Sequence, residues 1–208
     1  MRVIGLSGAQ GAGKSTLLSE VRARGWSLDE FKVSRSVQRE LGWESLDRVL
    51  DSFVTMVQFQ HEVFRQKLKH DLELSRAKGA RTIDQKGHVI LTERTFADVW
   101  AYANLWAWRF LDQGRARFNE VHSFLLAFTR LCSEAQNAVY SGVLLLPLMD
   151  HIQWENDANR ASRGDADSVY ENIQWFMGRR ALNIPTATIS GISVPERADE
   201  VELFLRRF

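Results

Sequence analysis

The chain has 208 residues, 45% of them hydrophobic, and a formal net charge of +1 at pH 7. This size and composition suit one domain with a proper core, and the near-neutral charge gives no global sign of nucleic-acid binding, although a local basic groove stays open. Because no run of 18 apolar residues occurs and Cys132 is the single cysteine, a membrane-spanning helix and an internal disulfide are both excluded.

The first predicted strand, residues 2–6, runs into the most informative segment of the chain. Gly8-Ala9-Gln10-Gly11-Ala12-Gly13-Lys14-Ser15 fits the pattern G-x-x-x-x-G-K-[ST] at every fixed position, and a helix over 14–24 is predicted directly after it. A glycine-rich turn before a helix start points backbone N–H groups at phosphate oxygens. Lys14 can reach the β- and γ-phosphates, and the Ser15 hydroxyl can bind Mg²⁺. The sequence therefore predicts a triphosphate site formed by Gly8, Gln10, Gly11, Ala12, Gly13, Lys14, Ser15 and Thr16.

The remainder of the chain alternates helical patterns with short apolar runs. Hydrophobic residues recur every three or four positions from Leu46 to Leu72, which predicts a long helical stretch that one or more turns interrupt. In chain order we expect a weak strand at 26–28, a helix at 34–41 capped by Ser34, the long stretch from 46 to Lys78-Gly79, a strand at 88–92, helices at 96–111 and 117–138, a buried strand at 143–148, a helix at 165–182, a strand at 187–190 and a closing helix at 195–208.

These elements predict an α/β fold, a P-loop NTPase three-layer sandwich with helices on both faces of a central parallel sheet of about five strands. We expect one domain over residues 1–208, with an added helical segment at 112–138. Phosphate chemistry in such a fold takes place at the carboxyl ends of the strands. The strand ends that carry polar groups are the loop at 8–15, Asp29-Glu30, Glu93-Arg94 and the stretch after 148.

A second candidate motif, Glu93-Arg94-Thr95, directly follows the predicted strand at 88–92. A carboxylate there can take the proton of an attacking hydroxyl group or hold Mg²⁺ through water, and the arginine can clamp phosphate oxygens with its planar fork. As a bare dipeptide, Glu-Arg would be an ordinary surface pair. Its place after a clear strand, in a chain with the phosphate loop, favours a role in phosphoryl transfer.

A third polar segment runs from Asp150 to Asp165, after the buried strand. Arg160 and Arg163 are three residues apart, so they would share one face of a helix. A mobile segment with two arginines can close over a triphosphate, neutralise charge in the transition state and exclude water. A solvated loop with charges of both signs fits the segment equally well, and both interpretations stay open.

With these motifs the chain resembles the P-loop nucleoside and nucleotide kinases, including phage deoxynucleoside monophosphate kinases and nicotinamide-riboside-kinase-like ATP-binding domains. The resemblance rests on residues 8–16, on the segment from Thr92 to Tyr102 and on the arginine-bearing stretch 150–163. It implies ATP and Mg²⁺, with Lys14 and Ser15 at the phosphates and the metal. It also implies that Glu93 is the catalytic or metal-organising carboxylate, that Arg94 is a phosphate clamp, and that Arg160 and Arg163 belong to a lid at about 150–165.

The same resemblance assigns the acceptor side to helices within about 30–80. Asp29, Arg35 and Arg39 lie where such kinases hold the acceptor, although ordinary surface charge at a helix start explains them equally well. Three of the seven tryptophans fall within 100–108, beside the Glu-Arg motif. Most are expected in the core, and one or two near the site could stack on an acceptor base. Contacts with adenine are expected at the turn Ser190-Gly191-Ile192.

The predicted activity is therefore transfer of the γ-phosphate of ATP to a nucleotide or nucleoside. A first alternative is a phage-type kinase that phosphorylates a hydroxymethylated base, 5-hydroxymethyluracil, within DNA, which arginines at 109, 115, 117, 130, 179 and 180 would serve. A second is a non-kinase NTP-hydrolysing switch, although the guanine-reading string Asn-Lys-x-Asp is absent. Without a signal peptide before the first strand, a cytoplasmic location is expected, the host cytoplasm for a phage protein. A homodimer stays open.

Overall fold

The computed structural model describes residues 1–76, 88–148, 163–178 and 182–208, and it contains one sheet of five strands. All four neighbouring strand pairs are parallel. The α/β fold with a parallel sheet of five strands is therefore confirmed. Across the sheet the order is β2 (Ser27–Asp29), β3 (Val89–Glu93), β1 (Arg2–Ser7), β4 (Gly142–Leu145) and β5 (Thr186–Thr188).

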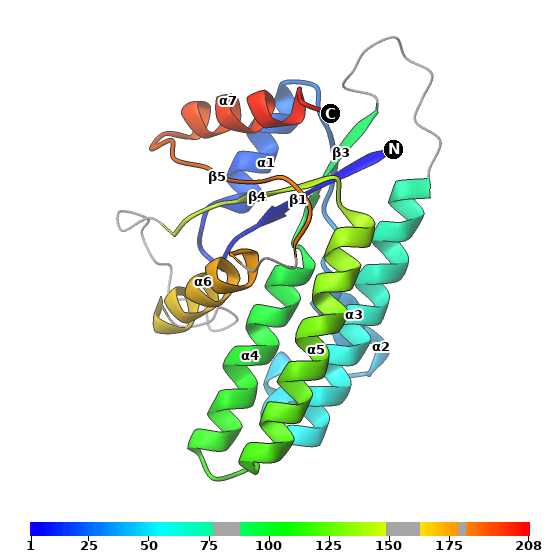
Figure 1. Ribbon diagram of the computed structural model, residues 1–208, viewed down its shortest axis with the longest axis vertical. Coiled ribbons are helices and arrows are strands. Elements are labelled where there is room, and N and C mark those ends of the chain that lie inside the picture. Colours follow the sequence, from blue (N-terminus) through cyan, green and yellow to red (C-terminus); the bar gives the residue numbers. More distant parts are fainter. Residues whose placement is uncertain (77–87, 149–162, 179–181) are drawn as a thin grey trace.

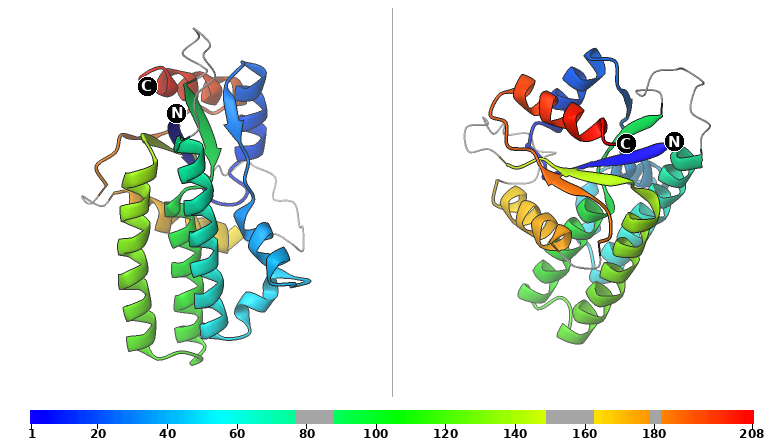
Figure 2. Two further views of the ribbon diagram at one scale, coloured as in Figure 1. Left: turned by 90° about the vertical axis from the view of Figure 1, so that its right-hand side faces the viewer. Right: turned by 45° about the horizontal axis from the view of Figure 1, so that its top comes forward.

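Helices cover both faces of this sheet and complete the predicted three layers (Figure 1). One face carries α1 (Lys14–Ala23) and α7 (Val194–Leu205). The opposite face carries the long helices, which extend well beyond the sheet in both views of Figure 2. These long helices are α3 (Phe53–Arg76), α4 (Phe96–Asp112) and α5 (Phe118–Val139). The shorter α6 (Arg163–Met177) lies on the same face beside the sheet, and α2 (Val33–Glu40) and the 3₁₀ helix η1 (Leu46–Leu50) connect β2 to α3.

Strand β1 contributes to a hydrophobic core on each side of the sheet. Successive side chains of a strand point to opposite faces. Ile4 and Leu6 accordingly pack with Leu17 of α1 and Val201 of α7, whereas Val3 belongs to the larger core under α3, α4, α5 and α6. Because both faces of the sheet are buried, the central strands are apolar without alternation, which is why they were recognisable in the sequence.

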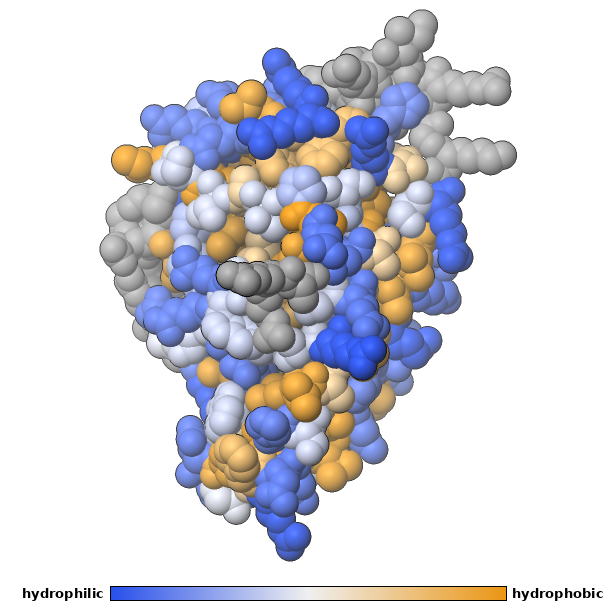
Figure 3. Space-filling model, viewed as in Figure 1, coloured by the Kyte–Doolittle hydropathy of each residue, from blue (hydrophilic) through white to orange (hydrophobic). Residues whose placement is uncertain are grey.

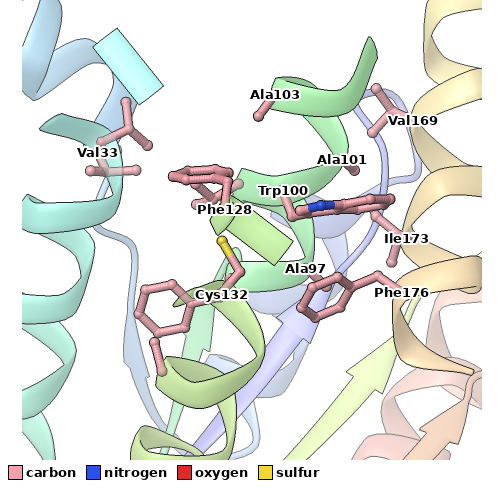
Figure 4. Close-up of a cluster of buried hydrophobic side chains, with 14 of the residues drawn as sticks. Val33, Ala97, Trp100, Ala101, Ala103, Phe128, Cys132, Val169, Ile173 and Phe176 are labelled. Carbon is pink, nitrogen blue, oxygen red and sulfur yellow. The ribbon is translucent and has the colours of Figure 1, made fainter. Parts of the chain in front are cut away.

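The larger core contains the aromatic segment beside the Glu-Arg motif. Trp100 is 4% exposed, donates its indole N–H to Thr129 Oγ1 at 2.7 Å and stacks on Trp175 with ring centroids 4.9 Å apart. Figure 4 shows Trp100 with Cys132 and Phe176 where α4, α5 and α6 meet. Trp100 is therefore a core residue, as expected of most tryptophans. Cys132 is fully buried as well, and burial raises the pKa of its thiol well above the usual value.

One helix start differs from the prediction, while the long stretch from 46 is broken by a turn, as expected. Ser34 does not cap α2, which begins at Val33 after Lys32 and has no side-chain cap. The long stretch from 46 divides into η1 and α3, because the Ser52 hydroxyl accepts the backbone N–H of Thr55 at 3.0 Å and so begins a new helix. Residues 78 and 79, where that stretch was expected to end, lie outside the described residues.

The ends of the later elements also shift. β4 stops at Leu145 instead of 148, before Pro147, which cannot donate to a sheet. Helix α6 runs from Arg163 to Met177 instead of 165–182. The expected helical segment at 112–138 is α5, which pairs with α4 away from the sheet.

The described surface is mixed in polarity. On the face in Figure 3, hydrophilic residues are interspersed with smaller hydrophobic areas. Among the described helices, none combines the length and the hydropathy that crossing a bilayer requires.

Candidate functional site

Two neighbouring strands, β1 and β3, bring the phosphate loop and the Glu-Arg motif together at the carboxyl ends of the sheet's strands. β1 is the central strand, and its register pairs Leu6 with Glu93 of β3 and Ser7 with Leu145 of β4. The phosphate loop leaves β1 at this edge, and Glu93 ends the neighbouring strand. The structure therefore places the loop beside the Glu-Arg motif, as the strand-end argument predicts.

Two glycines of the loop are required by its geometry. A Cβ atom on Gly8 would lie 2.8 Å from the carbonyl oxygen of Leu146, so no larger residue fits. Gly13 precedes α1 with φ at 82°, a left-handed conformation that glycine adopts without strain. The chain then enters α1, on which Ser15 and Thr16 are exposed at the N-terminal end.

Lys14 lies inside the concave side of the loop. It is only 5% exposed, and its ammonium group donates to the carbonyl oxygens of Gly8 at 2.6 Å and Ala9 at 2.7 Å. Burial, and next the positive charge of Arg94, lower the pKa of Lys14 to about 8, against the opposing effect of Asp98 and Glu93. A buried cation that has only backbone carbonyls as hydrogen-bond partners gains from a bound anion.

This lowered pKa predicts how triphosphate binding depends on pH. A bound polyanion favours the ammonium form and raises the pKa of Lys14, so binding takes up a proton once the pH exceeds about 8. We expect the affinity for a non-hydrolysable ATP analogue to be flat from pH 7 to 8 and to fall above that, by up to about tenfold per pH unit. Calorimetry in two buffers of different ionisation enthalpy measures the proton uptake.

The control for this pH profile is Lys14→Arg. A guanidinium does not titrate in this range, so the pH profile of that variant should stay flat whatever its affinity. A wild-type affinity that is unchanged up to pH 9.5 would contradict the predicted titration of Lys14.

Glu93 and Arg94 lie next to Lys14 but differ in their surroundings. Glu93 is 9% exposed at the end of β3. Arg94 has φ at 67°, the one positive value outside glycine among the described residues, and its guanidinium lies 5.3 Å from the ring centroid of Tyr102. Burial lowers the pKa of Arg94, but Tyr102, Asp98 and Glu93 more than offset this, and the net pKa is raised. Arg94 is therefore a permanent cation beside the loop.

One residue of the site was missed by the sequence reasoning. Asp98 is 1% exposed, and its carboxylate accepts hydrogen bonds from Ser7 Oγ at 2.8 Å and from the N–H of Gly8 at 3.2 Å. It also completes a capping box with Thr95 at the start of α4. The pattern Thr95-x-x-Asp98 signals that capping box in the sequence, but not the contact with the loop.

A second missed residue connects the loop to the turn after β5. Arg197 of α7 is 5% exposed, and it donates from Nε to the Gly191 carbonyl at 2.9 Å and from Nη1 to the Ala12 carbonyl at 3.5 Å. Burial lowers the pKa of Arg197. The turn expected to contact adenine, 190–192, therefore lies next to the phosphate loop. Its N–H groups at Ser190 and Ile192 already bond to carboxylates of α7.

Asp29 ends β2, next to β3, and is held by a polar network. Its Oδ2 accepts a hydrogen bond from Thr92 Oγ1 at 3.1 Å and lies 2.9 Å from His70 Nε2. The fully buried ammonium of Lys67 donates to Thr92 Oγ1 at 3.3 Å and pairs with Asp71 at 2.9 Å. Asp29 is thus oriented from two sides.

The other predicted residues are less closely connected. Arg35 and Arg39 are exposed on α2, and the described contact of Arg39 is with the carbonyl oxygen of Arg35, not with Asp29 or Glu93. Arg160 lies outside the described residues. Arg163 begins α6, and the rest of the lid expected at about 150–165 lies almost entirely outside the described residues.

The donor set of this site fits Mg²⁺ bound to a nucleotide. Oxygen ligands are available from the exposed hydroxyl of Ser15 and from the carboxylate of Glu93. Among the described residues there is no group of three or more His, Cys, Asp or Glu side chains that could hold a metal ion. Mg²⁺ at phosphates needs only one or two protein ligands, because phosphates and water supply the others.

Comparison with known proteins agrees with this architecture. A family model described as "AAA domain" matches residues 3–197, whereas no curated protein matches the sequence. Deoxyadenosine kinase from M. mycoides, solved with the products dCMP and a flexible dCDP, is similar with a TM-score of 0.65 and 14% identity, over 99% of this chain and 100% of that chain. Its structure with bound dATP gives a TM-score of 0.67 and 13% identity over the same shares. At these identities the similarity is one of fold, and it agrees with the predicted three-layer α/β sandwich of the P-loop NTPase type.

Proposed function

This chain belongs to the AAA domain family, and from that premise we propose that it is a phosphotransferase that moves the γ-phosphoryl group of ATP to a nucleoside or nucleotide. The observation that carries the proposal is the position of Glu93 and Arg94, at the end of β3 beside the phosphate loop. A phosphate loop alone serves many kinds of NTP-binding protein, whereas Glu93 and Arg94 beside it add a carboxylate and a fixed cation. These are the groups that phosphoryl transfer to a separate acceptor requires.

In this proposal the donor lies along the phosphate loop. The loop's backbone N–H groups and Lys14 bind the phosphates, and Arg94 binds oxygens of the transferred group. Ser15 and Glu93 hold Mg²⁺, which when bound neutralises charge on the β- and γ-phosphates. Arg197 fixes the loop to the turn at 190–192, so that turn is the proposed neighbour of the donor base.

The acceptor is proposed to lie on the β2 side of Glu93. Asp29 ends the strand next to β3, and Thr92 and His70 orient its carboxylate. The acceptor hydroxyl attacks the γ-phosphorus while the bond to the β-phosphate oxygen breaks, and its proton passes to a carboxylate of the site. Arg35 and Arg39 of α2 stay proposed contacts of the acceptor.

Deoxynucleosides are the first acceptors to test. The protein of similar fold described above is a deoxyadenosine kinase, seen with dATP and with dCMP. Three of the six arginines that would favour DNA are engaged locally: Arg109 pairs with Asp165, Arg115 donates to carbonyls of Leu50 and Asp51, and Arg130 pairs with Glu134. Arg179 and Arg180 lie outside the described residues. These contacts argue against a continuous basic groove among the described residues and favour a small acceptor.

The test is transfer from labelled ATP, with Mg²⁺, to a panel of deoxynucleosides, nucleosides, monophosphates and DNA that contains 5-hydroxymethyluracil. Label on a nucleoside or monophosphate is the expected result. Label on DNA would instead support the base kinase. Phosphate release without a labelled acceptor would support an NTP-hydrolysing switch and contradict the proposal.

Asp29→Asn tests the acceptor side separately. Loss of the carboxylate charge should raise the KM for the acceptor about tenfold or more, because hydrogen bonds to charged groups are worth about 1.5–3 kcal/mol. The affinity for ATP should stay unchanged, since Asp29 ends β2, and β3 separates β2 from β1, the strand that leads into the phosphate loop. Asp112→Asn, an exposed carboxylate at the end of α4, is the matched control. An Asp29→Asn enzyme with wild-type acceptor kinetics would contradict this assignment.

A further inference from the structure

Asp98 is in contact with both parts of the site. Its carboxylate accepts the Ser7 hydroxyl and the Gly8 N–H from the β1 side. From the β3 side it accepts the N–H of Thr95 at 2.8 Å and the Thr95 hydroxyl at 3.1 Å, and Arg94 Nη1 lies 3.8 Å away. Four donors from two strand ends thus meet on one buried side chain.

This arrangement exceeds what a helix cap needs. The capping box of α4 uses Oδ2, which accepts from the backbone of Thr95. The other oxygen, Oδ1, accepts the N–H of Gly8, which is 90 residues away in the chain. A capping residue without a second role could leave this oxygen to water.

The contact with Gly8 fixes the start of the phosphate loop. The Gly8 N–H bonds to Asp98, its carbonyl oxygen accepts the ammonium of Lys14, and its Cα faces the carbonyl of Leu146 so closely that no Cβ fits. The first residue of the loop is therefore held on three sides. The direction in which the following N–H groups point depends on this residue.

The contact with the β3 side fixes Arg94. Its positive φ is a conformation that a non-glycine residue keeps only where its surroundings hold it. The neighbouring Thr95 N–H is bound to Asp98, the Arg94 N–H is bound to the Leu6 carbonyl at 3.0 Å, and the Arg94 guanidinium faces the same carboxylate. The carboxylate of Asp98 therefore orients Arg94 and also holds the phosphate loop.

We infer that Asp98 is a positioning residue that sets the phosphate loop and the Arg94 clamp in one fixed relation, an inference that rests on the proposed phosphoryl transfer. Asp98 touches no reacting atom and acts through Gly8 and Arg94. A fixed relation between these two matters most when the phosphoryl group moves between donor and acceptor. Loss of the Asp98 carboxylate should therefore lower turnover more than it weakens binding of the donor.

Asp98→Asn is the sharpest test, because asparagine has the same shape. Its amide offers one acceptor oxygen and one NH₂ group, so either the Gly8 N–H or the Thr95 N–H must face another donor. We expect kcat to fall at least about 30-fold and the KM for ATP to change less than about threefold. Hydrogen exchange at the Gly8 amide should become faster than in the wild type.

The matched control is Glu120→Gln. Glu120 accepts the N–H of Arg117 at 2.8 Å at the start of α5, so it has the same capping role but lies far from the sheet (Figure 1). This control should keep wild-type kinetics. If Asp98→Asn behaved like Glu120→Gln in kcat and in exchange at Gly8, Asp98 would be a cap alone and the inference would be overturned.

Two further measurements keep the result decisive. Ser7→Ala removes one donor and leaves the cap of α4 intact, so a folded protein with a smaller fall in kcat is expected even where Asp98→Asn folds poorly. A Ser7→Ala enzyme with wild-type kcat and wild-type exchange at Gly8 would count against the inference. If the wild type transfers phosphate to no acceptor, the proposed function fails, whereas exchange at Gly8 and binding of inorganic pyrophosphate still report whether Asp98 orders the loop.

Discussion

Lys14→Ala should abolish phosphoryl transfer, with a loss of at least about 10³-fold in kcat/KM. The ammonium group of Lys14 is buried against the loop, and its partners are the loop carbonyls of Gly8 and Ala9. Alanine leaves the backbone cradle in place but removes the charge that the transferred phosphoryl group needs as it leaves ADP. Transfer of labelled phosphate in single-turnover experiments measures the effect.

The stability of the same variant provides its control. Burial disfavours the charged form of Lys14 and lowers its pKa. Removing a buried cation without a carboxylate partner should therefore cost little stability, and the Tm should stay within a few degrees of the wild type. A folded Lys14→Ala protein with more than a tenth of wild-type turnover would contradict the role assigned to Lys14.

Glu93→Gln should lower kcat by about 10²- to 10³-fold, because glutamine keeps the shape of Glu93 but neither holds Mg²⁺ well nor accepts a proton. The Mg²⁺ concentration for half-maximal activity should rise at the same time, whereas the acceptor KM should change little. A titration of activity with Mg²⁺ at saturating ATP distinguishes these effects from those of Asp29→Asn.

Two further variants serve as controls for Glu93→Gln. Glu93→Asp keeps the charge but retracts it, so it should recover part of the activity at high Mg²⁺. Glu134→Gln changes an exposed carboxylate that pairs with Arg130 on α5, and it should behave as wild type. Near-normal turnover of Glu93→Gln would show that Glu93 has no role in transfer.

The phosphate loop and its neighbour could be predicted because their signals are local. The spacing of Gly8, Gly13 and Lys14 lies within one turn of chain, and Glu93 follows an apolar strand whose end must meet the other strand ends of a parallel sheet. The fold followed from the same pattern, since strands buried on both faces are apolar throughout. These parts required no knowledge of distant contacts.

The remaining parts of the site depend on such contacts. Asp98 bonds to Gly8 across 90 positions of sequence, and Arg197 bonds to Ala12 across 185. Local patterns show that both residues belong to helix starts, but the tertiary fold decides which backbone groups they reach. The cap predicted at Ser34 failed for a related reason, because packing of Val33 and Val37 rather than a side-chain bond begins α2.

The central position of β1 has a consequence for the order of folding. The Leu6 carbonyl is bonded to Arg94 and the Ser7 carbonyl to Leu146, so β1 acquires its two neighbours only after some 90 and 140 further residues of the chain. Contacts of such long separation form slowly, since the intervening chain must first be closed into loops. The contacts that hold the start of the phosphate loop therefore form only after β3 and β4 have paired with β1.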